Sequence, residues 1–224
     1  MNNIDELRNL MALDANKNTP EIESCFEQIA KMLFECFAIQ KGEKKYLFKE
    51  IEFYFYNKNH RDIITHPRVS DSLCWYVNDF GGIDLNFESR IKRETKVNSK
   101  GKNVMKYVLD DSAYFGGILI RKLAEKDSGE VLDGPWACAE LFRTFDATCS
   151  DIYKDLPILV EHENGGLGNF MPKERVHILK PKQTVEGKVN NILYQYHDNV
   201  QPAKEILYKE FDSFKGKHYG YEKI

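Results

Sequence analysis

Residues 46–56 read YLFKEIEFYFY, a run in which apolar side chains alternate with polar or phenolic ones. A period of two predicts a β-strand, because successive side chains of a strand point to opposite faces of its sheet. One face of this strand carries Ile51, Phe53 and Phe55, and the other carries Glu50, Glu52, Tyr54 and Tyr56. The stretch therefore predicts a sheet with one apolar face and one face that holds two carboxylates.

The elements around this strand mix helices and strands without the βαβ rhythm of a parallel sheet. Thr19-Pro20-Glu21 is typical of a helix start with Thr19 as the N-cap, and the apolar spacing that follows predicts a helix over about 20–38. We expect another helix from Pro135 to about Phe145 and a mostly helical tail over about 185–214, interrupted at Pro202. Further strands are expected at 73–78, 83–88, 118–123, 156–160 and 175–179. The fold class is therefore α+β, with a largely antiparallel sheet.

The composition fits a single domain of 224 residues, of which 42% are hydrophobic and 30% charged. A net charge of −3 gives no overall attraction to polyanions, so a polyanion site must be local. Residues 1–18 are polar and predict an N-terminal arm or a short surface helix ahead of a domain at 19–224. They lack the features of a secretory signal, and no apolar run is long enough to span a membrane. We therefore expect an intracellular, cytoplasmic protein that binds no membrane and keeps its five cysteines reduced.

The common nucleotide, metalloprotease and hydrolase motifs are absent, which leaves isolated polar residues on apolar strands. Glu52 lies among aromatic residues, which should raise its pKa and would allow it to act as a general base. The alternative is that Glu52 lies on the solvated face of an edge strand. Arg121, in the run GGILIRKL, could neutralise a buried acid or lie at a strand edge.

Two other groups of residues, one aromatic and one polar, can each be interpreted in two ways. Trp75 and Tyr76 could form a stacking platform for a nucleobase or belong to a half-buried core. His60, Asp62 and His66 share a polar loop, but their spacing does not match that of a zinc site. We therefore expect no metal and no cofactor.

A basic segment lies between residues 90 and 106, within an insertion at about 90–112. It has one acid, Glu94, and seven basic residues: Arg90, Lys92, Arg93, Lys96, Lys100, Lys102 and Lys106. The segment predicts a basic hairpin or a flexible loop. It could contact phosphates, or it could be a solvated run of charge.

Five short motifs occur in a recognisable order. They are Glu50-Ile51-Glu52-Phe53-Tyr54, Thr65-His66-Pro67-Arg68, Tyr76 with the later Asn86, Ile118-Leu119-Ile120-Arg121, and Leu132-Asp133-Gly134-Pro135. A further segment, Arg143-Thr144-Phe145-Asp146 followed by Asp151-Ile152-Tyr153, extends the series. In this order the motifs resemble the alkyladenine (3-methyladenine) DNA glycosylase family over about residues 25–180.

The resemblance implies a curved, mostly antiparallel sheet with surrounding helices, the formyltransferase C-terminal-like fold of that family. It also implies a monomeric enzyme of base-excision repair that flips a damaged purine out of duplex DNA and hydrolyses its N-glycosidic bond. Glu52 would activate the attacking water, and Arg121 would hold that water or a nearby phosphate. The resemblance implies neither a metal nor a lysine nucleophile.

The same resemblance assigns four residues to the pocket for the flipped base. Tyr54 and Tyr76 would be its opposite aromatic walls, His66 would close it, and Asn86 would discriminate the base by contact with its edge. The basic insertion is not part of the family pattern, which is shorter between Asn86 and Arg121. It could supply phosphate contacts from Arg90, Lys92, Arg93, Lys96, Lys100 and Lys102, or it could be a hairpin with no role in DNA binding.

The chain departs from the family pattern at the residue that would enter the duplex. The family has an aromatic wedge three residues after the second pocket tyrosine, whereas this sequence has Asp79, followed by Phe80. Two alternatives therefore remain open. One is a glycosylase-fold protein that binds a nucleobase or nucleoside, and the other is an N-glycoside hydrolase that acts on free nucleosides or single strands.

Overall fold

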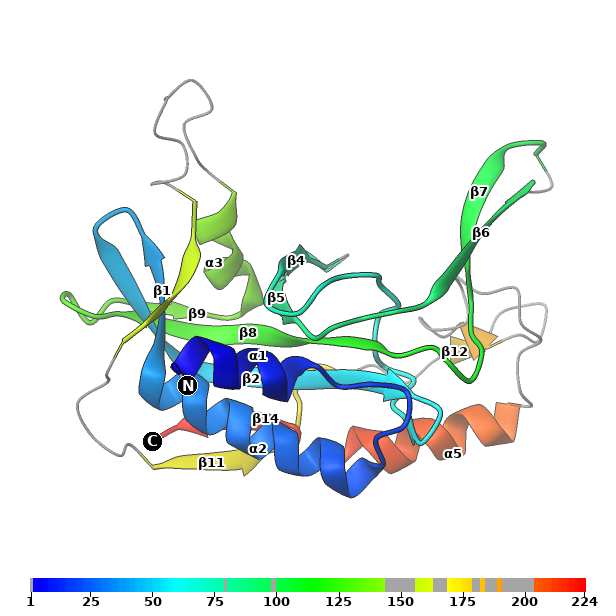
Figure 1. Cartoon of the computed structure of the whole chain (residues 1–224), viewed down its shortest axis with the longest axis horizontal. Helices are drawn as coiled ribbons and strands as arrows, with labels where there is room; N and C mark the ends of the chain where they lie inside the picture. Colours follow the sequence, from blue (N-terminus) through cyan, green and yellow to red (C-terminus); the bar gives the residue numbers. More distant parts are fainter. Residues whose placement is uncertain are drawn as a thin grey trace.

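The structure is a computed structural model of the chain (Figure 1), and it describes residues 2–78, 80–97, 100–143, 156–162, 169–178, 182–183, 189–190 and 204–224. The described helices are α1 (Asn3–Met11), α2 (Thr19–Cys36), α3 (Pro135–Ala139), the 3₁₀ helix η1 (Glu140–Phe142) and α5 (Lys204–Lys215). The largest sheet contains β1 (Phe37–Lys41), β2 (Lys44–Asn57), β3 (His60–Arg61), β4 (Trp75–Val77), β5 (Ile83–Asn86), β8 (Phe115–Glu125), β9 (Val131–Asp133), β10 (Ile158–Glu161), β11 (Phe170–Lys173) and β14 (Gly220–Lys223). Two separate pairs are β6 (Lys92–Val97) with β7 (Asn103–Val108), and β12 (Lys182–Gln183) with β13 (Val189–Asn190).

Every strand pairing among the described residues is antiparallel. The main sheet has the order β10-β1-β2-β8-β5-β4, and β14 pairs with β2 over Glu50–Glu52. The long strands β2 and β8 form its centre, paired from Tyr46 opposite Glu125 to Tyr56 opposite Phe115. The predicted α+β class with a largely antiparallel sheet is confirmed.

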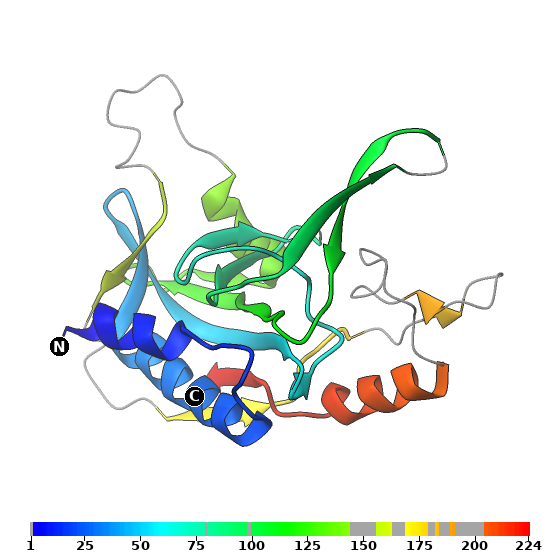
Figure 2. The ribbon, with the colours of Figure 1, turned by 45° about the vertical axis from the view of Figure 1, so that its right-hand side comes forward.

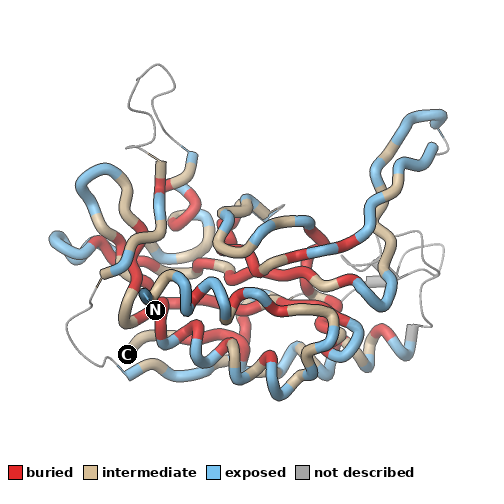
Figure 3. Tube along the Cα trace, in the orientation of Figure 1, coloured by how far each residue is buried: buried red, intermediate tan, exposed pale blue. Residues whose placement is uncertain are grey.

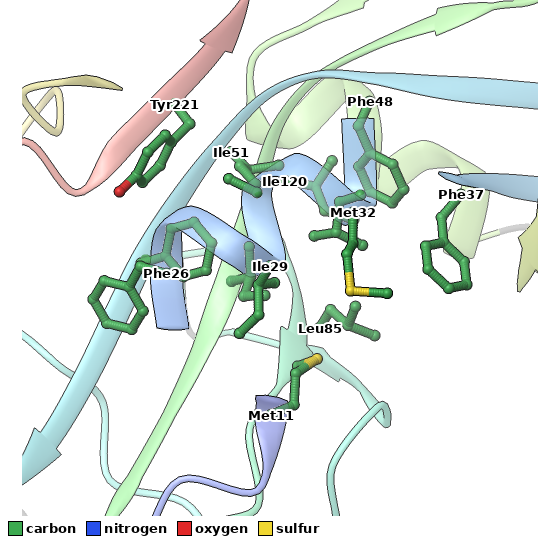
Figure 4. Packing of buried hydrophobic residues seen from close by; sticks show 14 of the residues in the cluster. Met11, Phe26, Ile29, Met32, Phe37, Phe48, Ile51, Leu85, Ile120 and Tyr221 are labelled. Carbon is green, nitrogen blue, oxygen red and sulfur yellow. The ribbon is translucent and has the colours of Figure 1, made fainter. Parts of the chain in front are cut away.

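The apolar face of β2 packs against α2 and forms the main core (Figure 4). Phe26 of α2 stacks on Phe53 of β2 with their ring centroids 4.5 Å apart. Ile51, Phe53 and Phe55 are completely buried, in agreement with the alternation in the sequence. Each such side chain contributes roughly 1.5–3 kcal/mol through burial, so this face contributes substantially to the stability of the fold.

Helix α2 is stabilised at its start by a capping box. The side chain of Asn18 accepts a hydrogen bond from the backbone N–H of Glu21, and the carboxylate of Glu21 accepts one from the backbone N–H of Asn18. These two bonds satisfy N–H groups that have no partner inside the helix. The N-cap is therefore Asn18, whereas the sequence pattern suggested Thr19, whose hydroxyl donates to the carbonyl oxygen of Asn59 at 3.2 Å.

The first eighteen residues contain a helix that belongs to the core. Helix α1 lies beside α2 (Figure 1), and Leu7, Met11 and Leu13 are buried in the same cluster as Phe26 and Phe53. The segment was expected to be a polar arm or a short surface helix. The helix is present, and its few apolar residues anchor it.

The second face of the main sheet is polar and nevertheless buried. Figure 3 shows buried positions continuing along the central strands, in contrast to the exposed hairpin of β6 and β7. The buried polar residues on this face are Glu50, Glu52, Asp84 and Asn86. Because burying a charge requires compensation by partners, the carboxylates on this face need cations or hydrogen-bond donors beside them.

The C-terminal third differs most from the sequence-based expectation. Over 175–178 the chain is not a strand, and the strand of this region is β11 at Phe170–Lys173. Within the expected helical tail, the structure describes a helix only from Lys204 and a short strand at Val189–Asn190, while most of the rest lies outside the described residues. Strand β14 was not expected at all, and it completes the sheet beside Glu50 and Glu52.

The helix expected from Pro135 is present as α3 followed by η1, whereas the segment 144–153 that extended the family resemblance lies outside the described residues. None of the described helices combines the length and the apolar composition that are needed to cross a bilayer.

The basic segment forms a two-stranded hairpin, here called the β6–β7 arm and comprising residues 92–108. Among the described residues it pairs with no other strand, and it projects from the body of the protein (Figures 1 and 2). At its base, Arg90 forms an isolated bridge with Tyr114. Of the two expectations for this segment, the hairpin is the one that the structure contains.

Candidate functional site

The polar face of the sheet brings together residues from three neighbouring strands. Asp84 of β5 pairs with Leu119 of β8, which pairs with Glu52 of β2. In the next row, Asn86 pairs with Gly117, which pairs with Tyr54. Residues directly opposite each other in an antiparallel sheet share a face, so Glu52, Tyr54, Asp84 and Asn86 all point to one side.

Gly117 leaves room at the centre of this arrangement. A Cβ atom at Gly117 would lie 2.8 Å from Nη1 of Arg68 and 3.1 Å from Oδ1 of Asn86. Any larger residue would collide with these groups. The glycine therefore allows the side chain of Arg68 to cross the face of β8.

The Glu52 carboxylate is held by hydrogen bonds at both oxygens. The Tyr54 hydroxyl donates to Oε2 at 2.8 Å, and the backbone N–H of Val176 donates to Oε1 at 2.8 Å. Nε of Arg121 lies 3.7 Å from Oε1. Since Glu52 is only 1% exposed, the interpretation as a solvated residue on an edge strand is wrong.

Burial raises the pKa of both groups that could move a proton here. Removal from water raises the pKa of Glu52, although Arg121, the Val176 N–H, the Tyr54 hydroxyl and Arg175 all act to lower it. Burial and the nearby Glu52 raise the pKa of Tyr54 well above its usual value. Tyr54 therefore stays protonated as a donor, while Glu52 is more basic than an exposed carboxylate.

Arg121 neutralises buried acids, which was one of its two sequence-based interpretations. Its Nε atom lies 3.5 Å from Oε1 of Glu50 as well as 3.7 Å from Glu52. Glu50 also contacts Lys173 at 3.1 Å and Lys122 at 3.8 Å. Lys173 and Lys122 offset part of the negative charge of Glu50. The positive charge of Arg121 therefore remains available to interact with Glu52.

A second group of residues surrounds Tyr76 and Asn86. Nη1 of Arg68 donates to Oδ2 of Asp84 at 2.6 Å and to Oδ1 of Asn86 at 2.9 Å. Its guanidinium carbon lies 4.2 Å from the centroid of the Tyr76 ring. Asn78 donates to the other oxygen of Asp84 at 3.0 Å. Because arginine only donates, Asn86 must turn its amide oxygen toward Arg68, and its amide nitrogen is the group left to meet a ligand.

The two tyrosines proposed as pocket walls each carry a guanidinium on one ring face. Arg68 covers Tyr76, and Arg175 lies over Tyr54 with its guanidinium carbon 4.7 Å from the ring centroid. A nucleobase that stacks on either ring must therefore use the opposite ring face or displace an arginine.

His66 lies beside the turn that joins β4 and β5. It is buried, and its ring contacts Phe80 edge-on with the centroids 5.6 Å apart. Phe80 is 67% exposed, so an aromatic ring is available on the surface at this turn. Asp79, the residue at the wedge position, lies outside the described residues.

The basic residues of the insertion lie on the β6–β7 arm or at its base, and the arm projects from the body of the protein (Figure 2). Lys92 and Lys96 share one face of β6 with Glu94, and Lys92 lies 3.1 Å from that carboxylate. Arg93 points to the other face, and Lys100 and Lys102 lie in the connecting turn. At the base, Arg90 pairs with Asp71 and Glu88.

Three residues near Glu52 were missed by the sequence analysis: Asp62, Arg175 and Val176. Asp62 and Arg175 form a fully buried ion pair at 2.6 Å, and Val176 follows directly in the chain. Asp62 was considered only as a metal ligand, and Arg175 was assigned to a strand. No local pattern could have joined them, because the contact spans 113 residues of sequence.

The described residues contain no group of three or more histidine, cysteine, aspartate or glutamate side chains that could hold a metal ion. No protein-family model, no curated protein and no solved structure matches this chain.

Proposed function

We propose that this protein hydrolyses the N-glycosidic bond of a damaged purine nucleotide in DNA, with Glu52 as the general base. The observation that supports this most strongly is the Glu52 carboxylate itself, buried among aromatic residues and oriented by Tyr54 and Val176. A carboxylate with a raised pKa is well suited to take a proton near neutral pH. Arg121, Tyr76, Asn86 and His66 then have the roles that the family resemblance implies.

The proposed reaction needs only water as its second substrate. Water attacks C1′ of the nucleotide while the bond from C1′ to the base nitrogen breaks, and the bonding electrons leave with the base. The proton of the water passes to Glu52. Because the sugar gains positive charge in the transition state, the carboxylate also stabilises that charge.

The first test is release of free base from duplex DNA that contains alkylated purines. Glu52→Gln should lower the rate by about 10²–10⁴-fold, because the amide cannot accept the proton from water. Glu43→Gln, which removes an exposed acid between β1 and β2, serves as the control and should retain the rate. Unchanged release by Glu52→Gln would exclude Glu52 from the mechanism.

The β6–β7 arm is proposed to contact phosphates of the duplex. Replacing Lys96, Lys100 and Lys102 together by Ala should reduce the slope of log Kd against log salt by about 3, since each lost phosphate contact removes about one unit of slope. The control replaces the exposed Lys31, Lys209 and Lys215, which changes the net charge equally. An equal effect of both variants would indicate a general charge effect.

A second function is favoured by the arginines on the two tyrosine rings. If Arg68 and Arg175 keep their places, the site would suit a free nucleobase or nucleoside better than a nucleotide extruded from a duplex. Binding of a modified purine without base release, and without salt-dependent duplex binding, would support this alternative. Release from nucleosides or single strands alone would indicate an N-glycoside hydrolase.

A further inference from the structure

The buried ion pair of Arg175 with Asp62 lies directly beside the Glu52 carboxylate. Nη1 of Arg175 donates to Oδ2 of Asp62 at 2.6 Å, and Nη2 donates to Oδ1 at 3.3 Å. Both side chains are fully buried. A two-point contact of this kind fixes the guanidinium in direction as well as in position.

The same guanidinium contacts two other parts of the chain. Nη1 also donates to the carbonyl oxygen of Phe53 at 3.2 Å, and Nη2 donates to that of Phe214 at 2.9 Å. Its face covers the ring of Tyr54. Arg175 therefore anchors its own backbone to β2 and to the end of α5.

The residue after Arg175 carries the contact to Glu52. The backbone N–H of Val176 donates to Oε1 of Glu52 at 2.8 Å. His177, which follows, has a φ of 58°, in the left-handed region that residues other than glycine rarely adopt. Such a conformation costs about 1–3 kcal/mol and persists only where the surroundings enforce it. The turn at 175–177 is therefore held in place by its anchors.

We infer that Arg175 and Asp62 are positioning residues that hold the Val176 amide against Glu52 and thereby fix the orientation and the proton affinity of this carboxylate. The inference rests on the proposed function, in which Glu52 is the general base. Neither residue needs to touch the substrate.

The charged and titratable groups that face Glu52 are Arg121 from β8, Arg175 from the turn, and Tyr54 and Glu50 from its own strand. The Val176 N–H and the charge of Arg175 both favour the ionised carboxylate. If the Val176 N–H and the Arg175 guanidinium move away, less of the pKa increase caused by burial is offset. The pKa of Glu52 should therefore rise.

Arg175→Lys is the informative variant, because lysine keeps the charge but cannot make the two-point contact with Asp62. The matched control is Arg61→Lys. Arg61 also pairs with a carboxylate, Glu210 of α5, with Nε of Arg61 2.6 Å from Oε1 of Glu210, and so ties the same part of the chain to β3. Both variants weaken an arginine–carboxylate contact near α5. Only Arg175 is connected to Glu52, because the backbone N–H of the next residue, Val176, donates to that carboxylate.

The decisive readout is the titration of the Glu52 side-chain carboxyl carbon by NMR, with Glu52→Gln used to assign the signal. Arg175→Lys should raise the pKa of Glu52 by about one pH unit, and Arg61→Lys should leave it in place. In the pH profile of base release by Arg175→Lys, the acidic limb should shift to higher pH by the same amount. The value of kcat should fall about tenfold or more, and KM should stay nearly unchanged. A Glu52 titration that is unchanged in Arg175→Lys would overturn the inference.

The two hypotheses can fail separately. If the wild-type protein releases no base but the Glu52 titration moves as expected, the glycosylase function fails and the positioning role stands. If base release depends on Glu52 while the titration does not move, the function stands and the positioning role fails.

A measurement on the wild-type protein covers the case in which Arg175→Lys does not fold. The amide proton of Val176 should change its chemical shift as Glu52 titrates, and this change should vanish in Glu52→Gln. A Val176 amide that does not respond to Glu52 would also overturn the inference.

Discussion

Both faces of β2 are largely buried, and they are stabilised in different ways. On one face, Phe53 packs against Phe26 and other apolar side chains of the core. On the other, Glu52 and its neighbours are held by hydrogen bonds and ion pairs with specific partners. Apolar packing depends on volume and contact area, whereas a buried charge depends on one partner in one position.

The difference teaches where the protein can tolerate change. A smaller apolar residue leaves a void whose cost depends on how far the surroundings can close. Loss of one member of a buried ion pair leaves a charge that nothing else can satisfy. Substitutions on the polar face should therefore lower stability most when they leave a charge without its partner. Substitutions on the apolar face should lower stability according to the volume that they remove.

The largest effect is expected from breaking the buried pair of Arg175 and Asp62. Asp62→Ala should lower the free energy of unfolding by about 3–5 kcal/mol, because Arg175 keeps a buried charge without its partner. The double replacement Asp62→Leu with Arg175→Met should recover most of this loss. Urea denaturation of the three proteins measures both values.

The apolar face supplies the contrast for this experiment. Phe53→Ala should cost about 3–5 kcal/mol, and adding Phe26→Ala should not recover any stability. If the double replacement of Asp62 and Arg175 were as unstable as Asp62→Ala, the distinction between the two faces would fail.

An intermediate effect is expected from pH, because His60 on the apolar side and Glu52 on the polar face respond to pH with opposite sign. On the apolar side, burial lowers the pKa of His60 from 6.5 to about 4. The stability that this histidine contributes is present above pH 6.5 and is lost as the pH falls toward 4, by up to about 3 kcal/mol. Glu52 has a raised pKa, so its contribution is present at low pH and is lost as the pH rises.

Unfolding free energies measured between pH 4 and pH 8 test this pair of signs. His60→Gln should flatten the decline below pH 6.5, and Glu52→Gln should make the protein relatively more stable at neutral pH. His218→Gln, which replaces an exposed histidine, is the control and should retain the wild-type profile. A His60→Gln protein with the wild-type pH dependence would contradict the assignment.

The smallest effect concerns the strained turn on the polar face. His177→Gly should raise the free energy of unfolding by about 0.5–1 kcal/mol, because glycine adopts a positive φ without steric cost. The gain should leave the contact between Val176 and Glu52 intact. A loss of stability in this variant would mean that the His177 side chain contributes more than its backbone strain costs.

The fold could be predicted from sequence wherever a periodic pattern was long enough. The alternation over 46–56 correctly predicted β2 and its two faces, and the apolar spacing after Thr19 correctly predicted α2. Prediction failed in the C-terminal third. The run GYEK at 220–223 is short and mixed, and its strand depends on pairing with β11 and β2, which are distant in the sequence.

The candidate site was predictable only in part, for a related reason. Glu52, Tyr54 and Arg121 could be found because they interrupt regular strands. Arg175 and Asp62 could not, because their importance lies in a contact between distant segments of the chain. Likewise, no motif indicates that Arg68 covers Tyr76 and orients Asn86.

The late position of Val176 in the chain has a consequence for biosynthesis. Val176 follows Glu52 by 124 residues, so at about 5–20 residues per second it leaves the ribosome roughly 6–25 s later. Strand β14, which pairs with β2 over Glu50–Glu52, is made later still. During this interval the part of β2 at Glu50–Glu52 lacks its β14 neighbour and would be open to pairing with other nascent chains. Charged side chains disfavour pairing at a strand edge, so we expect Glu50 and Glu52 to limit aggregation of the growing chain.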